Sequence, residues 1–536
     1  MLAAAAASAT RDAAAPKMRA ALLGTAVSCV LLAIISTLIP QGLYTDPSWQ
    51  LKALQQWRAG ESSNLNCLVE PNPADLSQDR GEWISWWSFS VPVLAAPLLS
   101  LGLSVGSAIR VLSLTGLVVG AFGWALWASR LLSHKLLLPI LAALLPFLHY
   151  AVQPLFFFSA ESFVFAAVPW VLLAVIRVHK SNSMPMHLVA GIFAGCLYFL
   201  KYSAVFVTIG CCLFLFLRTR GLARAVAGIG ASLPILAVTL LNRHMGAAGN
   251  LVLASVSFHF SWSAVMAAFG NPSLIVADLD AMLRRLLFFP SHRLLNSELW
   301  LPGIGLTGSI WLVWLVMSRK SRSEPAALAA VVFCSGVVAL LAIWMVSSGA
   351  SFEARHLAGC TLQLLPFVVS EVNERRRLAH MLMLSIFVVA PLAYGPITLP
   401  VKVFHQKRVI PGPSGVYNAT LANSDVGLTL TFLRSMYSRN SDVWYIPDPV
   451  SSLDIPGRAV IRSAVFTDLP RLEAERFRNF KTMRALILLS PDLEKSGRAD
   501  LIRHSFVNAE EWTVIPIPDS PYRLWISTLR PNLKSR

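Results

Sequence analysis

The feature that most constrains this chain is a series of long apolar runs. An α-helix rises about 1.5 Å per residue, so about 20 residues cross the roughly 30 Å hydrocarbon core of a bilayer. Runs that approach this length lie near residues 20–39, 107–129, 136–153, 160–177, 187–202, 203–217, 223–241, 299–317, 325–347, 357–372 and 379–397. The pattern predicts a mainly α, polytopic bundle of about eleven transmembrane helices.

The amino-acid composition also indicates a membrane environment. Only 14% of the residues are charged and 55% are hydrophobic, whereas soluble domains carry roughly 25% charged residues. A soluble protein of 536 residues would need more charge to cover its surface. The formal net charge of +17 could indicate nucleic acid, but the basic residues lie in short clusters between the apolar runs. We therefore expect the membrane bilayer, and no nucleic acid, as a partner.

These basic clusters alternate with the predicted spans. If residues 1–19 form a cytoplasmic N-terminus, every second turn is basic, as the enrichment of Lys and Arg in cytoplasmic loops requires. The five turns contain Arg130 and Lys135; Arg177 and Lys180; Arg218, Arg220 and Arg224; Arg319, Lys320 and Arg322; and Arg375, Arg376 and Arg377. We predict a multi-pass cell-membrane protein with an extracytoplasmic C-terminal domain.

The same topology divides the chain into regions. A transmembrane region over 20–397 carries outward loops at 41–87 and 242–298, and an extracytoplasmic tail covers 398–536. A proline-containing apolar stretch at 88–104 indicates a helix at the membrane surface. The tail alternates strand-like and helical patterns, which predicts a small α/β domain. Its strands are expected at Val443–Ile446, Ala485–Leu489, Trp512–Ile517 and Arg523–Ile526, and its helices near 427–437, 472–479 and 492–504.

Asp46 is the first candidate for chemistry, because it follows the first span on the outer side. A carboxylate at this position meets both lipid headgroups and water. Apolar side chains recur after it at helical spacing, which indicates an amphipathic helix at the interface: Trp49, Leu51, Leu54 and Trp57. Asp46 would then be the N-cap of this helix. That structural role is the alternative to a catalytic one, although the two are compatible.

Glu161 is the second acidic candidate and lies at the outer end of the fourth predicted span. Placing an ionisable side chain so close to hydrocarbon costs free energy, so we take a functional role for Glu161 as the working hypothesis. The alternative is a glutamate solvated at the level of the headgroups. Asp46 and Glu161 could together bind a divalent metal (Mg²⁺ or Mn²⁺) through oxygen ligands, or divide base and orienting roles.

Basic residues on the outer side are unexpected, because Lys and Arg are enriched in cytoplasmic loops, and a functional role would explain them. The candidates are Lys201, Arg243, Arg355 and His356. Anionic phosphate is one reason, because Arg forks onto phosphate oxygens. Pairing with lipid headgroups, or of Arg355 with Glu353, is the alternative. No nucleotide-binding motif is present, so a phosphate-bearing substrate is expected to be linked to a lipid.

The order of these features resembles the C-type (GT-C) glycosyltransferases, multi-span enzymes similar to protein mannosyltransferases and the lipid A aminoarabinose transferase. The resemblance rests on the outward Asp46, the approach Trp86–Pro92 and the next span beginning at Ser107–Ser113, and it extends to about residue 397. It implies that Asp46 acts on the acceptor and that Glu161 is a second outward acidic residue. It also implies that Arg355 contacts the phosphate of a polyprenyl-phosphate donor.

The sequence therefore predicts a glycosyltransferase that moves a sugar from a polyprenyl phosphate to an unidentified acceptor hydroxyl outside the cytoplasm, by a single inverting displacement. Another enzyme of lipid-linked glycans, such as a ligase or polymerase, is one alternative. A transporter or flippase is a second, and it usually shows paired repeats and helices broken in mid-membrane. A non-catalytic envelope-assembly protein is a third, and it would not require Asp46, Glu161 or Arg355.

Overall fold

The computed structural model describes most of the helical region and the main strands of the tail. The described residues are 2–60, 65–68, 81–83, 87–132, 136–181, 183–245, 300–317, 323–346, 354–375, 378–407, 409, 411–417, 442–446, 450–454, 458–461, 484–489, 494–495, 512–517 and 522–526. Most of the second outward loop and the expected helices near 427–437 and 472–479 lie outside them. Of the helix expected at 492–504, residues 494–495 are described and are helical.

Six helical stretches among the described residues are long and apolar enough to cross a bilayer. They are Pro16–Thr37 of α1 (Leu2–Thr37), α4 (Val105–Leu131), Leu137–Phe156, α7 (Glu161–Val178), α10 (Ala223–His244) and Glu324–Ile343 of α15 (Glu324–Val346). Shorter apolar helices are α3 (Ser90–Ser100), α8 (Met184–Leu200), η2 with α9 (Tyr202–Ala204, Val205–Arg218) and part of α14 (Trp300–Met317). The mainly helical fold with several candidate spans is confirmed, and the count of eleven stays a prediction.

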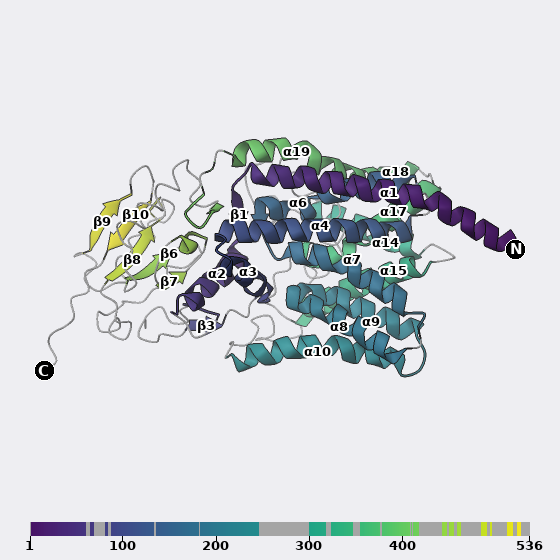
Figure 1. Cartoon of the computed structure of the whole chain (residues 1–536), viewed down its shortest axis with the longest axis horizontal. Helices are drawn as coiled ribbons and strands as arrows, with labels where there is room; N and C mark the ends of the chain where they lie inside the picture. The colour runs from purple at the N-terminus through teal and green to yellow at the C-terminus, as the bar shows by residue number, and fades with distance from the viewer. Residues whose placement is uncertain are drawn as a thin grey trace.

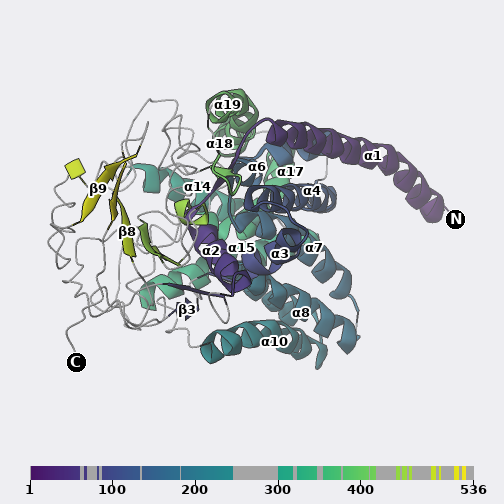
Figure 2. The same cartoon turned by 60° about the vertical axis from the view of Figure 1, so that its left-hand side comes forward.

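The helices run side by side in one block (Figures 1 and 2). α4 packs against both α1 and α7, and α8 packs along α10. The α8–α10 crossing is close because small residues line it: a Cβ on Gly191 would lie 2.1 Å from the Ala227 carbonyl oxygen, and one on Gly195 would lie 2.3 Å from that of Ala231. Such small-residue contacts are typical of helices that pack in membranes.

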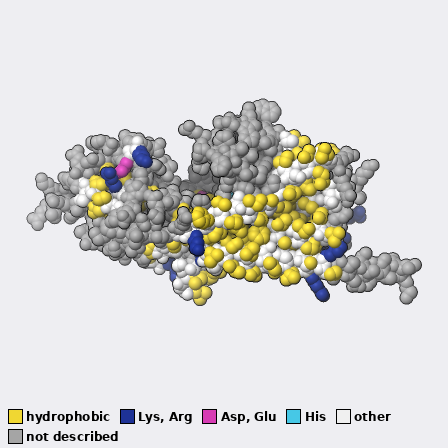
Figure 3. All heavy atoms as spheres, turned by 90° about the horizontal axis from the view of Figure 1, so that it is seen from above, with side chains coloured by type: hydrophobic (Ala, Val, Ile, Leu, Met, Phe, Trp, Pro, Cys, Tyr) yellow, Lys and Arg dark blue, Asp and Glu magenta, His cyan; other side chains and the backbone are white. Residues whose placement is uncertain are grey.

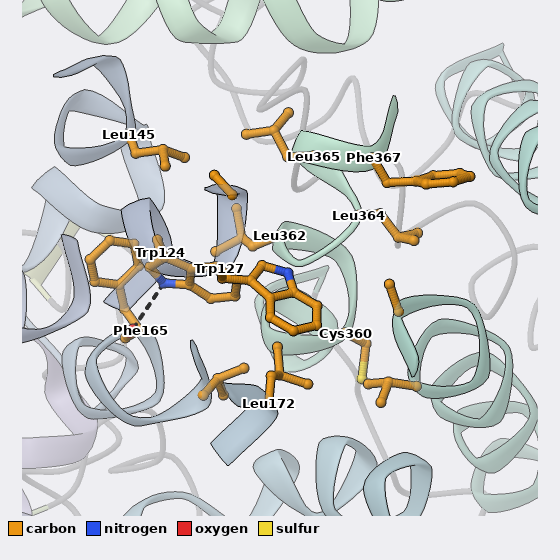
Figure 4. Close-up of a cluster of buried hydrophobic side chains, with 14 of the residues drawn as sticks. Trp124, Trp127, Leu145, Phe165, Leu172, Cys360, Leu362, Leu364, Leu365 and Phe367 are labelled. Carbon is orange, nitrogen blue, oxygen red and sulfur yellow. Dashed lines mark hydrogen bonds between the residues drawn. The ribbon is translucent and has the colours of Figure 1, made fainter. Parts of the chain in front are cut away.

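The core of the block centres on two tryptophans of α4 (Figure 4). Trp124 and Trp127 are both buried. Their indole N–H groups donate to the carbonyl oxygens of Phe165 and Gln363, each at 3.0 Å. Outside, one face of the block is covered largely by hydrophobic side chains (Figure 3). Soluble monomers rarely expose an apolar surface of this extent, so the surface supports a membrane environment.

Two sheets lie at the same end of the block, which we call the sheet end. The smaller is parallel, with the order β4-β1-β5, and consists of β4 (Phe157–Phe158), β1 (Gln41–Leu43) and β5 (Val416–Tyr417). The larger has the order β3-β2-β7-β6-β8-β10-β9. Its strands are β2 (Asn66–Leu68), β3 (Gly81–Trp83), β6 (Asp442–Ile446), β7 (Arg458–Ile461), β8 (Arg484–Leu489), β9 (Thr513–Pro516) and β10 (Arg523–Ile526).

The larger sheet joins parts of the chain that the sequence separates. The four strands predicted in the tail are present as β6, β8, β9 and β10. The sequence analysis did not foresee β7, nor that β2 and β3 of the first outward loop would extend the tail's sheet. Strands of three or four residues carry too little periodicity to be found without their partners. The described strands of the tail therefore share one sheet with β2 and β3 of the first outward loop.

Several predicted spans are interrupted. The segment Leu137–Phe156 consists of α5 (Leu137–Leu144), η1 (Leu145–Phe147) and α6 (His149–Phe156). The run at 357–372 breaks into η3 (Ala354–Leu357), α16 (Ala358–Leu362) and α17 (Leu365–Arg375). The last run consists of α18 (Leu378–Leu384), the π-turn η4 (Ser385–Val389) and α19 (Ala390–Gln406). α19 thus continues past residue 397, where the tail was expected to begin.

Candidate functional site

The small parallel sheet brings the two acidic candidates to one place. β1 pairs with β4 in the register Gly42 to Phe157 and Leu43 to Phe158. Each strand leads directly into a helix: β1 into α2 (Thr45–Arg58) and β4 into α7. Asp46 follows Leu43 by three positions, and Glu161 follows Phe158 by three positions. Because the strands are parallel, both carboxylate-bearing residues lie just beyond the same edge of the sheet, at the N-termini of two helices.

The close pairing of β1 and β4 depends on Gly42. A Cβ at this position would lie 2.3 Å from the Phe156 carbonyl oxygen and 2.6 Å from Cδ1 of Phe157. Any larger residue would push the strands apart. After the paired positions, the Tyr44 N–H still donates to the Phe158 carbonyl oxygen at 3.2 Å. The hydrogen bonding therefore continues to within two positions of Asp46.

Helix α2 differs from the sequence prediction in two respects. Tyr44 is the residue before the helix and Asp46 is its second residue, so Asp46 is not the N-cap. A carboxylate in the first turn still complements the helix dipole. The helix is also enclosed by protein: every residue from Pro47 to Leu54 is buried, including the polar Gln50 and Lys52, and Trp57 is exposed. A segment packed on all sides in this way does not lie on a membrane surface with one face in water.

Glu161 forms an ion pair with Lys201, the cation that the sequence analysis assigned to phosphate. Glu161 is the first residue of α7, and Lys201 lies in extended backbone between α8 and η2. The two side chains are 6% and 16% exposed, respectively. A buried pair of this kind needs direct contact, since neither charge is compensated by water. The two residues predicted to serve different roles are thus partners.

A chain of hydrogen bonds connects this ion pair to α2. The hydroxyls of Ser88 and Ser90 each donate to the carbonyl oxygen of Leu200 at 2.7 Å, directly before Lys201. The side-chain amide of Gln50, in α2, donates to the Ser88 carbonyl oxygen. The sequence analysis noted Trp86–Pro92 as a motif but gave Ser88 and Ser90 no role. Two serines at the start of an apolar helix are the one sequence signal that could have identified them, because buried hydroxyls need hydrogen-bond partners.

Arg355 and His356 reach the same neighbourhood through their backbone. Both lie in η3, which packs beside η2, the turn that follows Lys201. The side chain of Arg355 lies outside the described residues, and His356 is half-buried and in contact with other groups. A Cβ on Gly359, at the start of α16, would lie 2.9 Å from Cγ2 of Val207 in α9. The same Cβ would lie 3.2 Å from Cγ2 of Val168 in α7, so α16, which directly follows η3, packs closely on the helix that begins at Glu161.

Arg243, the fourth basic candidate, is exposed in the last turn of α10. Its buried neighbour Asn242 makes the connection to the site instead. The Asn242 amide donates to the Tyr202 hydroxyl at 2.9 Å and its oxygen accepts from the Trp83 indole at 2.9 Å. Asn242 therefore joins the first outward loop to the turn that follows Lys201, and the sequence analysis missed it.

The carboxylates do not fit a resident divalent metal in the part of the chain that the structure describes. Mg²⁺ needs near-octahedral oxygen coordination, with carboxylates as the usual protein ligands. Glu161 is engaged by the Lys201 ammonium, and no group of three or more His, Cys, Asp or Glu side chains gathers among the described residues. We derive no chemical step through a metal.

Three described basic residues of the predicted cytoplasmic turns lie at the opposite end of the block. Arg130, Arg177 and Arg218 each lie in the last turn of a helix that begins near the sheet end. We call this the far end. Glu324, at the start of α15, lies there as well, 3.7 Å from Arg218 and 3.9 Å from His179.

Comparison with known proteins finds likeness among solved structures. No model of a known protein family matches the chain, and no curated protein matches its sequence. The crystal structure of ArnT from Cupriavidus metallidurans, bound to undecaprenyl phosphate, is similar over 96% of this chain and 98% of its own, with a TM-score of 0.42 and 10% sequence identity. This is a likeness of fold to ArnT. It concerns the course of the chain and not its residues.

Proposed function

We propose that this chain is a membrane glycosyltransferase that moves a sugar from a polyprenyl-phosphate donor to an acceptor hydroxyl on the extracytoplasmic face. One observation carries the proposal: the parallel β1–β4 pair, the Glu161–Lys201 ion pair and η3 gather acidic and basic residues at one end of the helical block. The basic helix ends of the far end support a cytoplasmic assignment for that end. The sheet end would then face outward.

Lys201 is suited to hold the donor phosphate. An ammonium group has three N–H donors, and Glu161 accepts from it. This contact fixes the Nζ atom while other donors can reach phosphate oxygens. Arg355 would add a second cation from the neighbouring turn. As the bond to the sugar breaks, negative charge grows on the departing phosphate, and fixed cations stabilise that charge without reorganising.

Asp46 is suited to act on the acceptor. A carboxylate within hydrogen-bond reach of a hydroxyl can take its proton as the oxygen attacks the anomeric carbon. The attacking oxygen forms the new glycosidic bond, and the bond to the phosphate breaks with its electron pair. A single displacement of this kind inverts the anomeric centre. Because α2 is enclosed by protein, Asp46 would be held in one position.

A lipid-linked donor suits the setting. The described helices present apolar side chains on their outer surface, such as Leu23 and Val189, so a polyprenyl chain would be solvated alongside them. ArnT was crystallised with undecaprenyl phosphate, which makes that lipid a practical probe. The sugar and the acceptor would have to be found by screening.

The test replaces Asp46 with Asn, which keeps the size of the side chain and removes the base. Proteoliposomes of the purified chain would be given a panel of undecaprenyl-phosphate pentoses and hexoses with a membrane extract as acceptor. We expect release of undecaprenyl phosphate by the wild-type chain and a loss of about 10²- to 10⁴-fold in D46N. The matched control, Glu494→Gln, changes a carboxylate paired with Arg523 on the tail's sheet and should retain activity. Full activity in a folded D46N protein would overturn the role of Asp46.

Transport is the second candidate, because the break between α16 and α17 is of the type found in transporters. Here, however, protein groups occupy much of the break. The side-chain amide of Gln363 donates to the carbonyl oxygens of Ala329 and Cys360, each at 3.2 Å, and the backbone carbonyl oxygen of Gln363 accepts from the Trp127 indole N–H. In transporters such groups line a cavity and bind the substrate. Movement of undecaprenyl phosphate between leaflets, unaffected by D46N, would favour transport.

A further inference from the structure

A short segment of the tail packs against α2, the helix that carries Asp46. It consists of η5 (Ser451–Leu453) and Asp454, whose residue is only 4% exposed. A buried carboxylate is costly unless it is hydrogen-bonded. The groups that bind this carboxylate therefore indicate its structural role.

The carboxylate of Asp454 binds a tight loop that precedes β5. Its Oδ1 atom accepts from the backbone N–H of Ser414 at 2.6 Å. The loop closes with a hydrogen bond from the Gly415 N–H to the Gly412 carbonyl oxygen at 2.8 Å, and Gly415 has a φ of 79°. A Cβ on Gly412 would lie 2.3 Å from Oδ2 of Asp454. Only glycine at 412 leaves room for the carboxylate, so the loop and Asp454 are fitted to each other.

The same loop is fixed to the helical block and to β1. The Ser414 carbonyl oxygen accepts from the Gly106 N–H, in the first turn of α4, at 2.8 Å. Immediately afterwards, β5 pairs with β1 in the register Val416 to Gln41 and Tyr417 to Gly42. Because β1 continues into α2, the loop that Asp454 holds lies one strand away from Asp46.

The residues before Asp454 contact α2 itself. The side-chain amide of Gln55 donates to the Leu453 carbonyl oxygen at 3.3 Å. Val450 and Leu453 are buried in the same apolar cluster as Leu51 and Leu54 of α2. The segment 450–454 therefore touches the helix that carries Asp46 and, through Asp454, the strand layer that precedes it.

We propose that Asp454 is a positioning residue: its carboxylate fixes the 412–415 loop and β5 while its segment packs on α2, so that the tail sets the position of Asp46. The role of Asp46 rests on the proposed function. The mechanical part, that Asp454 holds β1 and α2 in place, does not. Nothing in the sequence of the transmembrane region alone would show this dependence.

The mechanical part is tested by hydrogen exchange on the full chain in lipid nanodiscs. Asp454→Ala leaves the Ser414 N–H without its acceptor, so residues 41–58 should exchange on the order of tenfold faster, a factor that corresponds to about 1.4 kcal/mol of local stability. Asp454→Asn keeps an oxygen for this N–H and should stay near wild type. Gly412→Ala should resemble D454A. The double variant Gly412→Ala/Asp454→Ala should exchange no faster than either single variant, because both substitutions remove the same contact between the carboxylate and the loop. Unchanged exchange in D454A would overturn the proposal.

The functional part is tested by transfer and by lipid binding. With Asp46 displaced by about 1 Å, kcat in D454A should fall by about 10²-fold, while undecaprenyl phosphate binding stays unchanged and D454N restores kcat. Glu494→Gln, which removes the partner of Arg523 on β10, is the control and should change neither. Faster exchange with unchanged kcat would refute the positioning of Asp46. Absence of transfer by the wild-type chain would refute the proposed function, while the exchange data would still decide whether Asp454 holds α2.

Discussion

Helix α7 has a cluster of charges at each end, and the two clusters differ in kind. At the sheet end, Glu161 and Lys201 are in direct contact and nearly buried. At the far end, Glu324 lies 3.7 Å from Arg218 and 3.9 Å from His179, and the side chains of Arg218 and Glu324 are 47% and 35% exposed. The 18 residues of α7 separate the clusters by roughly 27 Å.

The difference indicates what each cluster is for. A buried ion pair gains little stability over apolar residues of the same volume, because both charges lose their water. Its presence at the sheet end is therefore better explained by a task that needs a fixed charge. At the far end, the more widely spaced Arg218–Glu324 pair keeps part of its water and has a smaller cost, and its place among basic helix ends fits the charge bias that sets membrane topology.

The largest effect is expected from Lys201→Met. Removal of one partner leaves the Glu161 carboxylate buried without its cation, which costs about 3–5 kcal/mol. The free energy of unfolding, measured by denaturation with SDS in mixed micelles, should fall by this amount. The double variant Glu161→Gln/Lys201→Met should recover most of it. A single variant as stable as the wild type would contradict the buried pair.

The double variant also separates function from stability. It should fold but bind undecaprenyl phosphate on the order of 10- to 100-fold more weakly, because a charge-assisted hydrogen bond contributes about 1.5–3 kcal/mol. Binding can be followed by the change in tryptophan fluorescence of the full chain in detergent. Undiminished binding would mean that Lys201 is not a phosphate ligand, and the comparison between the two ends would lose its functional meaning.

The smallest effect is expected from Glu324→Gln at the far end. Ion pairs between side chains this exposed contribute below about 1 kcal/mol and are screened by salt. The same unfolding and binding measurements should therefore give values close to the wild type. A loss of stability as large as that of Lys201→Met would show that the two clusters are equivalent.

The sequence predicts the helices better than the contacts between them. Apolar runs identify helices because a bilayer demands length and hydropathy, and both are local properties. Glu161 and Lys201 were selected because each is an ionisable group at the outer end of a span. Their ion pair could not be predicted, since it joins positions 40 apart in the sequence through the packing of α7 and α8.

The errors have similar causes. Asp46 was expected as the N-cap, but the parallel pairing with β4 sets where β1 ends and α2 begins, and β4 lies more than 100 positions away. The tail was expected to be a small α/β domain, which stays a prediction. The entry of β2 and β3 into its sheet could not be foreseen, because β2 pairs with β7 over a long sequence separation. Asp454 gave no signal because its partner, the glycine loop, is recognisable only once both are folded.

The most direct measurement is a structure of the full chain in nanodiscs with undecaprenyl phosphate. The account predicts phosphate at the sheet end, within about 4 Å of the Lys201 Nζ atom, in a cavity that Asp46 also lines. Phosphate at the far end beside Arg218, or at the sheet end on a side that neither Lys201 nor Asp46 faces, would contradict it.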